Sequence, residues 1–397
     1  MSRQETSKLK ICFVGWGNSI HTQRWMQWFI NNGHEVHLIT DRISSIPGIT
    51  EHDISLADSY SGSRIKRYAN LEFNSYYLKL LKRMLKINLI KQIYKIRKII
   101  RDINPDILHL HTLLYPSYLG VFSNVVCPLV VTPWNGDIVW KTQWSFSRKY
   151  AVKSGLAKAD LITVDSHDLK IKTLQYGRYE NKIAYISFGV DTKLFHPEAK
   201  SPELRKRLRI DRDAPIVYSN RSFEELYNID IIIRAIPTVL RVLPKTIFLF
   251  SWHSASRKNS LMELAEGLGV MTNVRFIGKI KHDELPGYYA ESDVFVTIPS
   301  GDTISISLLE AMACSVAPVV SDLSSVRECI KDGVNGYIVP VRDINATAQA
   351  VIKLLKDKSL GESFAKTNRE WVVQNADWNK NMKKVEELYY KSLYRKH

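Results

Sequence analysis

Short apolar runs alternate with amphipathic, helix-length stretches along the whole chain. The apolar runs are rich in β-branched residues and bounded by turn formers, which is typical of strands buried in a parallel sheet. In the N-terminal half, we expect strands at 10–15, 33–40, 106–111, 128–132, 159–164 and 183–186. In the C-terminal half, we expect them at 215–219, 246–251, 274–278, 294–297, 317–321 and 337–339. The alternation predicts an α/β protein with mainly parallel sheets and helices between the strands.

A segment rich in turn formers, residues 189–197, separates the two halves. We predict an N-terminal Rossmann-like domain at 1–195 and a C-terminal one at 196–374. The remaining residues, 375–397, contain a long amphipathic helix expected at 375–390, with Asp377-Trp378 as its cap and start. The chain has 397 residues, of which 45% are apolar, enough for two or three domains with sizeable cores.

Several protein classes are disfavoured by the composition. No apolar run reaches the roughly 20 residues that a membrane-spanning helix needs, and the N-terminal stretch lacks a signal-peptide cleavage region. The four cysteines are scattered without paired spacing, so neither a disulfide framework nor a zinc site is indicated. They are Cys12, Cys127, Cys314 and Cys329. We therefore expect a cytoplasmic protein.

The positive charge is concentrated in the N-terminal half. Of the net charge of +16, residues 1–200 contribute 28 Lys and Arg against 16 Asp and Glu, or +12. Residues 79–101 alone hold nine basic residues and no acidic one. Apolar residues recur there every three or four positions, which predicts an amphipathic helix that ends before Asn104-Pro105. The stripe consists of Leu81, Leu85, Leu89, Ile93, Ile96 and Ile100.

Three interpretations of residues 79–101 stay open. The helix can pack on the core with a solvated basic face, or it can rest on anionic lipid, where each nearby Lys or Arg contributes roughly 1 kcal/mol. A nucleic-acid surface is disfavoured, because no helix-turn-helix, RNA-binding or zinc-finger signature accompanies the charge.

The most informative stretch is 302–339. A Ser- and Thr-rich loop leads from Asp302 into the helix-forming sequence LLEAMA, which contains Glu310. Unpaired N–H groups and the positive end of the helix dipole meet at such a helix start and suit a phosphate. A buried strand at 317–322, a second helix carrying Glu328, a tight turn at 332–336 and another strand follow. This order indicates a nucleotide-binding site.

The stretch resembles the donor-sugar motif of the retaining glycosyltransferases of family 4, the glycosyl transferases group 1. That motif has a Glu, seven residues, a second Glu within LEAMA, then PVV, SD, an acidic residue and DG-x-NG; here Asp302 stands at the first position. The segments GHEV, PDILHLH, GVDTKLFHP and NVRFIGKIKHDELPGYYAESDVFV also look like segments of the family, so the resemblance covers nearly the whole chain. It implies the GT-B fold: two Rossmann-like, doubly wound domains facing each other across a cleft, with the last helix crossing back to the first domain.

The resemblance also implies roles for donor-side residues. Glu310 matches the position that holds the donor ribose, where a carboxylate can accept two hydrogen bonds. Asp302, one methylene shorter than the family's Glu, matches the position that meets the transferred sugar. Arg221 matches a cation that neutralises the diphosphate, but Tyr227-Asn228 stands where the family has Lys-Gly. The backbone at the helix start would cradle the diphosphate, with two hydroxyls as further donors. These residues are Ser305, Ser307 and Leu308.

In the N-terminal half, Gly17 and Asn18 belong to the loop that in this family abuts the donor phosphates and the acceptor. His111 matches the His of the family's HxH segment, beside the transferred sugar. We assign His109 a structural role on the other side of the strand. Asp137 follows the next strand, where it can bind a sugar hydroxyl or simply complete an Asn-Gly-Asp turn.

Together these features predict a retaining, metal-independent hexosyltransferase in which Arg221, Asp302 and His111 are catalytic. It would use a UDP- or GDP-linked sugar, need no other cofactor, and act on a glycan or a lipid-linked acceptor. We expect no nucleic-acid partner, and place the protein at the inner membrane face if residues 79–101 bind anionic lipid. Two alternatives are a non-catalytic or regulatory GT-B protein that binds a sugar nucleotide or a partner enzyme, and a GT-B sugar-nucleotide epimerase. The sequence does not identify the sugar, the nucleotide, the acceptor or the oligomeric state.

Overall fold

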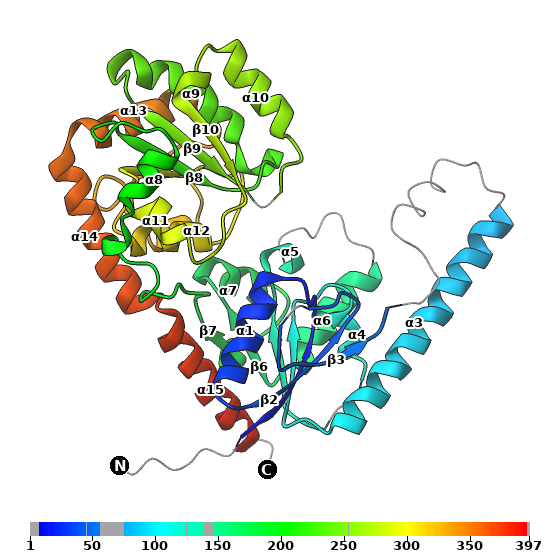
Figure 1. The fold of residues 1–397 in the computed structure, drawn as a ribbon. Helices are drawn as coiled ribbons and strands as arrows, with labels where there is room; N and C mark the ends of the chain where they lie inside the picture. Colours follow the sequence, from blue (N-terminus) through cyan, green and yellow to red (C-terminus); the bar gives the residue numbers. More distant parts are fainter. Residues whose placement is uncertain are drawn as a thin grey trace, which may run out of the picture. The chain divides into compact units, whose positions relative to one another are not determined.

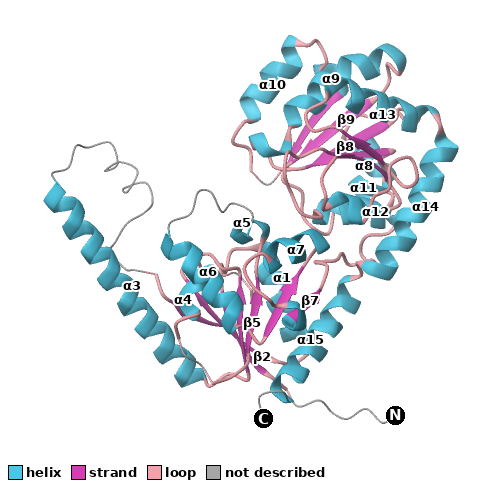
Figure 2. Ribbon diagram, turned by 180° about the vertical axis from the view of Figure 1, so that it is seen from behind, coloured by secondary structure: helices cyan, strands magenta, loops and turns pink. Residues whose placement is uncertain are grey.

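The computed structural model describes residues 8–44, 46–55, 75–123, 126–138, 146–252 and 254–394, with the side chains of 75–87 and 146–148 excepted. The chain divides into two compact units. The first unit comprises Met1–Val164, Leu169–Ile186 and Met382–His397, and the second comprises Asp165–Asp168 and Ser187–Asn381. Each unit contains one sheet with helices on its faces (Figure 1, Figure 2).

The sheet of the first unit is parallel, with the strand order β3-β2-β1-β4-β5-β6-β7. Its strands are β1 Lys10–Val14, β2 Glu35–Thr40, β3 Thr50–Asp53, β4 Ile107–His111, β5 Leu129–Thr132, β6 Leu161–Val164 and β7 Ile183–Tyr185. The pattern predicts all of them except β3, whose sequence TEHD has no apolar residue; as an edge strand, β3 pairs only with β2. The strand order reverses between β1 and β4, the place where doubly wound sheets bind ligands.

The helices of the first unit include the basic segment. They are α1 Ile20–Asn31, α3 Ser75–Ile103, α4 Ser117–Gly120, α5 Asn135–Ile138 and α6 Phe146–Lys158, with a 3₁₀ turn at Glu180–Lys182. In the described part of α3, the predicted apolar stripe packs on the core, since Ile96 and Ile100 are buried and Leu89 and Ile93 are partly buried. The side chains of Leu81 and Leu85 lie outside the described residues. Two further helices, α7 His167–Leu174 and α15 Trp378–Tyr394, have residues in both units.

The sheet of the second unit is also parallel, with the strand order β10-β9-β8-β11-β12-β13. Its strands are β8 Ile216–Asn220, β9 Ile247–Ser251, β10 Val274–Gly278, β11 Val294–Thr297, β12 Ala317–Ser321 and β13 Tyr337–Val339. Its helices are α8 Pro202–Arg207, α9 Ile229–Val242, α10 Lys258–Gly267, α11 Leu285–Ala290, α12 Ile306–Ala313, α13 Ile344–Lys356 and α14 Lys358–Asn375, with 3₁₀ turns at 197–199, 225–227, 271–273 and 326–328. The pattern predicts every one of these strands.

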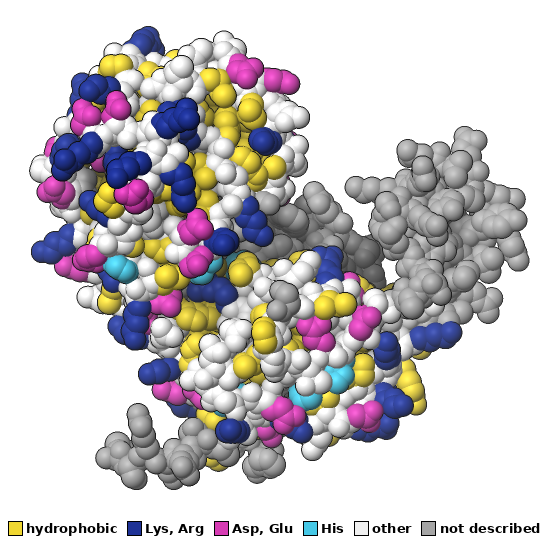
Figure 3. Space-filling model, viewed as in Figure 1, with side chains coloured by type: hydrophobic (Ala, Val, Ile, Leu, Met, Phe, Trp, Pro, Cys, Tyr) yellow, Lys and Arg dark blue, Asp and Glu magenta, His cyan; other side chains and the backbone are white. Residues whose placement is uncertain are grey.

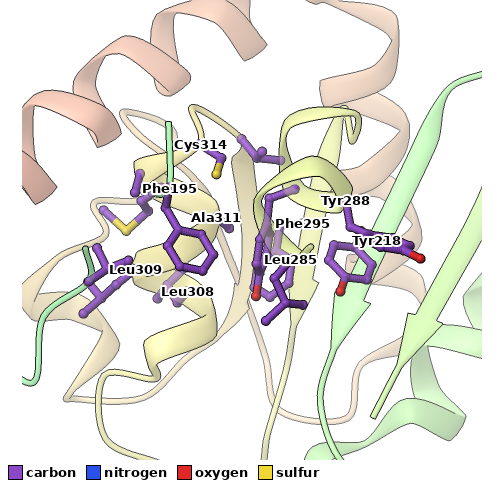
Figure 4. Close-up of a cluster of buried hydrophobic side chains, with 14 of the residues drawn as sticks. Phe195, Tyr218, Leu285, Tyr288, Phe295, Leu308, Leu309, Ala311 and Cys314 are labelled. Atoms are coloured by element: carbon purple, nitrogen blue, oxygen red, sulfur yellow. The ribbon is translucent and has the colours of Figure 1, made fainter. Parts of the chain in front are cut away.

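A buried cluster holds α12 against this sheet. Tyr218 of β8 and Phe295 of β11 lie on one side, and Leu308 and Leu309 of α12 lie on the other, together with Phe195 (Figure 4). Each of these side chains is almost completely removed from solvent. Burial at roughly 25 cal/mol per Å² of apolar surface makes such a cluster the main stabilising contribution to this face of the unit. The core therefore fixes the start of α12 relative to the ends of β8 and β11.

One expected helix differs from the structure, and the other, the closing helix, is confirmed. The helix expected around Glu328 is only the 3₁₀ turn Val326–Glu328. The expected closing helix is α15, which starts at Trp378 as predicted; α14 ends before it, at Asn375, because the backbone there pairs with Val190. Val190 N donates to Ala376 O at 2.8 Å, and Trp378 N donates to Val190 O at 2.9 Å. Asp377 caps α15 as predicted, since its Oδ1 accepts from Lys380 N at 2.9 Å.

No helix in the described ranges combines the length and the apolar character needed to cross a membrane. The four cysteines are free thiols, three of them buried.

Candidate functional site

The donor-side residues of the second unit meet at the carboxyl ends of β8 and β11 and at the start of α12. Arg221 follows β8, and Asp302 lies in the loop between β11 and α12. Arg221 Nη2 donates to Asp302 Oδ2 at 2.5 Å, and Arg221 Nη1 donates to Ser307 Oγ at 3.2 Å. The side chain of Arg221 is only 11% exposed to solvent, and that of Asp302 only 23%. The structure thus brings Arg221 together with Asp302 and Ser307, which lie 81 and 86 residues further along the chain.

Tyr227 lies against the same guanidinium. The Arg221 Cζ atom is 4.2 Å from the centroid of the Tyr227 ring, within the range of a cation–π contact. Burial raises the pKa of Tyr227 above its usual value, and the Arg221 charge opposes that shift. Where the family has a second cation, this chain therefore has a neutral ring that orients the first one.

Asn228 stands where the family's motif has Gly, the second position at which this chain departs from Lys-Gly. Its φ is 53°, in the left-handed region where only Gly and, among the other residues, mainly Asn and Asp are found. Its side chain is buried and fully used: Nδ2 donates to Ile298 O at 2.8 Å and to Ser300 Oγ at 2.9 Å, while Oδ1 accepts from Arg342 at 2.7 Å. Asn can adopt this backbone conformation, which otherwise favours Gly, and its side chain anchors the turn.

The start of α12 is capped from within. Ser305 Oγ accepts from Leu308 N at 3.3 Å, the arrangement of an N-cap, and lies 3.2 Å from Ser307 Oγ. Ser307 also accepts from Arg221. The Leu308 side chain is in the core, so only its backbone belongs to this surface. The helix start thus carries the hydroxyls and the cation that the sequence predicts there.

Glu310 lies one turn further along α12 and is buried. Tyr289 Oη donates to Glu310 Oε2 at 2.8 Å and accepts from Asn220 Nδ2 at 3.0 Å. Burial, followed by the charge of Glu310, raises the pKa of Tyr289 well above its usual value, so its hydroxyl keeps its proton and acts as a donor. Glu310 is predicted from the sequence, but Tyr289 and Asn220 are not, because they meet it only when α11 and the end of β8 pack near α12.

Asp165 is a second carboxyl group near Asp302 that the sequence analysis missed. It follows β6 directly, is buried, and is hydrogen-bonded to Ser166 and Thr303. Burial raises its pKa to about 7, while these bonds oppose the shift and the neighbouring Asp302 adds to it. Within the described ranges, its Oδ1 atom has no hydrogen-bond partner. In the sequence, the position of Asp165 directly after an apolar strand is the signal that could have identified it.

Glu328 organises the segment that follows Asp165. Its Oε2 accepts from His167 N and its Oε1 from Asp168 N, both at 2.8 Å. These are the first two residues of α7, whose N–H groups lack partners within the helix. The carboxylate therefore caps α7 and also matches the sign of its dipole.

In the first unit, His111 ends β4 and is completely buried. Its Nδ1 is 3.0 Å from Thr22 Oγ1, and its ring lies 5.2 Å from that of Trp25 and 5.5 Å from that of Trp134. Burial lowers its pKa well below the usual value, so the ring is neutral. Its Nε2 has no hydrogen-bond partner among the described residues.

The expectation that His109 faces the other side of β4 is wrong. Residues two apart in a strand point to the same face, and the rings of His109 and His111 are 5.2 Å apart. His109 is bonded on both nitrogens, to Thr132 Oγ1 at 2.7 Å and to Tyr389 Oη at 2.6 Å. It therefore joins α15 to the sheet of the first unit.

Gly17 and Asn18 differ in their surroundings. A Cβ atom at Gly17 would lie 2.2 Å from Arg42 O and 2.9 Å from Ser44 N, so the close approach of these loops requires glycine there. Asn18 is exposed.

Asp137 is a structural carboxylate. It is buried and accepts from Leu113 N at 2.8 Å, Trp134 N at 2.7 Å and Thr112 Oγ1 at 2.9 Å. Thr112 has a φ of 112°, an unusual value for a β-branched residue, and these bonds hold it there. Of the two roles open to Asp137, the structure supports the turn: it ties the loop after β4 to the loop after β5.

The part of the chain that the structure describes contains no group of three or more His, Cys, Asp or Glu side chains placed to hold a metal ion.

Comparisons with known proteins agree with this picture. Residues 200–371 match the family described as glycosyl transferases group 1, and residues 10–166 match the glycosyl transferase 4-like family. The chain is 23% identical to an N-acetyl-alpha-D-glucosaminyl L-malate synthase of Bacillus anthracis over 97% of this chain and 98% of that protein. It is 29% identical to a GDP-mannose-dependent alpha-(1-6)-phosphatidylinositol monomannoside mannosyltransferase of Mycolicibacterium smegmatis over 58% of this chain and 62% of that one.

The fold is similar to that of a solved glycosyltransferase from Rickettsia africae. The two structures superpose with a TM-score of 0.77 at 16% identity, over 98% of this chain and 99% of that one. The two parallel Rossmann-like sheets and this similarity show that the fold is GT-B, as predicted.

Proposed function

The chain belongs to the group 1, family 4-like glycosyltransferases, and from that premise we propose that it moves a hexosyl group, with retention, from a UDP- or GDP-linked donor to a glycan or lipid-linked acceptor. Its relatives are glycosyltransferases, so the two alternatives, an epimerase and a non-catalytic binding protein, are not supported.

The observation that carries the donor assignment is the cluster of Arg221, Asp302 and Ser307 at the start of α12, with Glu310 one turn later. A diphosphate leaving group develops negative charge as the anomeric bond breaks. A fixed guanidinium and a helix N-terminus stabilise such charge without reorganising at the moment of reaction. We assign Glu310 to the ribose hydroxyls and Asp302 to the transferred sugar. This arrangement needs no divalent cation.

The reaction that we propose takes place on one face of the sugar. The bond between the anomeric carbon and the phosphate oxygen breaks, and the acceptor oxygen bonds to the same carbon from the same side. The acceptor proton passes to the departing phosphate oxygen, so the nucleoside diphosphate leaves with it. The role of His111 beside the transferred sugar stays a proposal that rests on the sequence motif alone; burial lowers the pKa of His111 well below its usual value, so the ring is neutral.

The acceptor assignment rests on the surface of α3. In its described part, two large apolar side chains are exposed, Ile90 at 66% and Tyr94 at 70%, and Lys91, Lys98 and Arg101 are exposed near them. Figure 3 shows Lys and Arg side chains with apolar ones between them where this part of α3 runs. Such a surface suits anionic lipid at the inner membrane face. One relative is named for a phosphatidylinositol-linked acceptor, although another is named for malate.

Transfer or hydrolysis of a nucleotide-sugar tests the proposal. The purified full chain is incubated with a panel of UDP- and GDP-linked hexoses, and released nucleotide and product are measured, with the anomer assigned by NMR. We expect one donor to be consumed and the α or β configuration of that donor to be kept. An inverted product would refute the retaining mechanism, and no reaction with any donor, with or without added lipid acceptor, would refute the activity.

A further inference from the structure

The hydroxyl of Tyr289 is the last donor in a buried chain of hydrogen bonds that ends on Glu310. Tyr218 Oη lies 2.7 Å from Ser251 Oγ, and Ser251 Oγ donates to Asn220 Oδ1 at 2.9 Å. Asn220 Nδ2 then donates to Tyr289 Oη at 3.0 Å, and Tyr289 Oη donates to Glu310 Oε2 at 2.8 Å.

These bonds have one consistent direction. Because the Ser251 proton is used on Asn220, the Ser251 oxygen accepts from Tyr218. Each member then donates toward Glu310, and the chain ends on a carboxylate, which can only accept when it is ionised. Hydrogen bonds aligned in this way strengthen one another in a medium of low dielectric constant. All five side chains belong to the second unit.

The packing around this chain of hydrogen bonds restricts the movement of its side chains. Tyr218 and Tyr289 are completely buried, and their rings lie 5.1 Å apart in edge-to-face contact. The ring of Tyr289 also lies 5.5 Å from that of Phe295. The Tyr289 hydroxyl is therefore held by the core, and it in turn limits the rotation of the Glu310 carboxylate.

We propose that Tyr289 is a positioning residue for the donor nucleotide: its hydroxyl fixes the plane of the Glu310 carboxylate so that it can accept from both ribose hydroxyls. The inference rests on the proposed function, which assigns Glu310 to the ribose. It also links the two parts of the donor site, because Asn220, which holds Tyr289, directly precedes Arg221, which meets Asp302 and Ser307.

A hydrogen bond that only satisfies a buried carboxylate would have a different consequence. Its loss would lower stability, and it would weaken every nucleotide to the same extent. A bond that orients Glu310 toward the ribose affects only ligands that have the hydroxyls. Ligands with and without them therefore separate the two roles.

The test uses the Tyr289→Phe variant of the full chain, with Tyr288→Phe as the matched control. Tyr288 precedes Tyr289 on α11, but its hydroxyl accepts from Arg207 at 2.8 Å and lies outside the chain of bonds. Affinities for UDP, GDP and their 2′,3′-dideoxy counterparts are measured by titration calorimetry, and thermal unfolding of each variant is recorded.

For the nucleotide that the wild type binds, we expect Tyr289→Phe to weaken the ribose form about tenfold or more and the dideoxy form less than about twofold. With donor sugar, KM rises by a similar factor while kcat changes little. Tyr288→Phe leaves both affinities unchanged. If Tyr289→Phe fails to fold, Asn220→Ala replaces it, because Asn220 donates the hydrogen bond that holds Tyr289. We expect Asn220→Ala to show the same dependence on the ribose hydroxyls, with a smaller loss of affinity.

Equal weakening of the ribose and dideoxy forms, or no weakening of either, would refute the positioning role while leaving the glycosyltransferase intact. A wild type that binds the ribose and dideoxy forms equally well would overturn the assignment of Glu310 to the ribose. Failure of the wild type to bind either UDP or GDP would contradict the proposed donor itself.

Discussion

Arg221 and Asp302 form an ion pair across 81 residues of sequence, with Nη2 2.5 Å from Oδ2. The pair is largely buried, and the Tyr227 ring covers the guanidinium. A planar guanidinium can hold the carboxylate, the Ser307 hydroxyl and an aromatic face at once, whereas an ammonium group cannot. This geometry makes Arg221 the residue on which the diphosphate assignment depends.

Replacing Arg221 with Lys keeps the positive charge but removes the paired hydrogen bonds to Asp302 and Ser307 and the contact with the Tyr227 ring. We expect kcat/KM to fall about ten- to hundredfold, mainly through kcat, because stabilisation of the leaving group is lost in the transition state. Steady-state kinetics with the donor found in the panel measure the effect. Arg234→Lys, at an exposed position on α9, is the control and should be unaffected. Equal activity of the two variants would exclude Arg221 from catalysis.

The Glu310→Ala variant should lose nucleotide binding while keeping its fold. Truncation removes charge-assisted hydrogen bonds to the ribose, each worth about 1.5 to 3 kcal/mol, so affinity should fall about a hundredfold or more. Calorimetry measures affinity, and circular dichroism checks the fold. Glu362→Ala, on the exposed surface of α14, is the control. Unchanged affinity in Glu310→Ala would show that the donor site has been placed wrongly.

Activity should survive EDTA. In the proposed mechanism, Arg221 and the start of α12 supply the positive charge at the diphosphate, so chelating divalent ions removes nothing that the reaction needs. Initial rates are compared with excess EDTA, with Mg²⁺ and with Mn²⁺. A rate that collapses with EDTA and returns only with Mn²⁺ would contradict metal independence.

The exposed basic surface of α3 should bind anionic liposomes. We expect co-sedimentation with anionic vesicles at low salt and much less at high salt, because exposed charges are screened beyond about 8 Å at physiological ionic strength. The Lys91→Glu, Lys98→Glu, Arg101→Glu triple variant should lose binding. A variant with the same charge change in the second unit, at the exposed Lys281, Lys356 and Lys366, should keep it.

The outcome decides between the interpretations of this helix. A wild type that ignores anionic vesicles even at low salt would show that the basic face is only solvated, and would make a soluble acceptor the better proposal. Equal losses in both triple variants would point to net charge and not to α3.

Asp165 should make stability depend on pH. Its ordinary pKa is 3.8 and its folded pKa is about 7, so between these values the unfolded state binds fewer protons than the native state. The free energy of unfolding therefore falls as pH rises through this range, by at most about 1.4 kcal/mol per pH unit. This contribution is complete below pH 4 and lost above pH 7.

The measurement compares the wild type with Asp165→Asn by chemical denaturation from pH 4 to 8. The stability of the variant relative to the wild type should increase toward pH 7 and then level off. The buried His21, His109 and His111 have lowered pKa values and act with the opposite sign, but they are common to both proteins and cancel in the difference. A difference that does not change with pH would exclude the raised pKa.

Much of the fold follows from local pattern. Buried parallel strands are continuous apolar runs, so β12 and its neighbours are recognised without any knowledge of the rest of the chain. The edge strand β3 is not recognised, because TEHD exists as a strand only through its pairing with β2. The start of α15 is recognised from Asp377-Trp378, but the pairing of the backbone there with Val190, far away in sequence, is not.

The residue types at the candidate site are also in the sequence: Asp302, Glu310 and Arg221 stand at the positions of a recognisable motif. Their partners are not, because Tyr289 meets Glu310 only when α11 packs on α12, and Arg221 meets Asp302 only when β8 and β11 lie side by side. The sequence by itself determined the buried strands and the residue types at the candidate site, since hydrophobic periodicity and motif spacing are local properties. Only the tertiary structure decided which side chains hold the residues of the candidate site in place, since contacts between residues distant in sequence depend on packing.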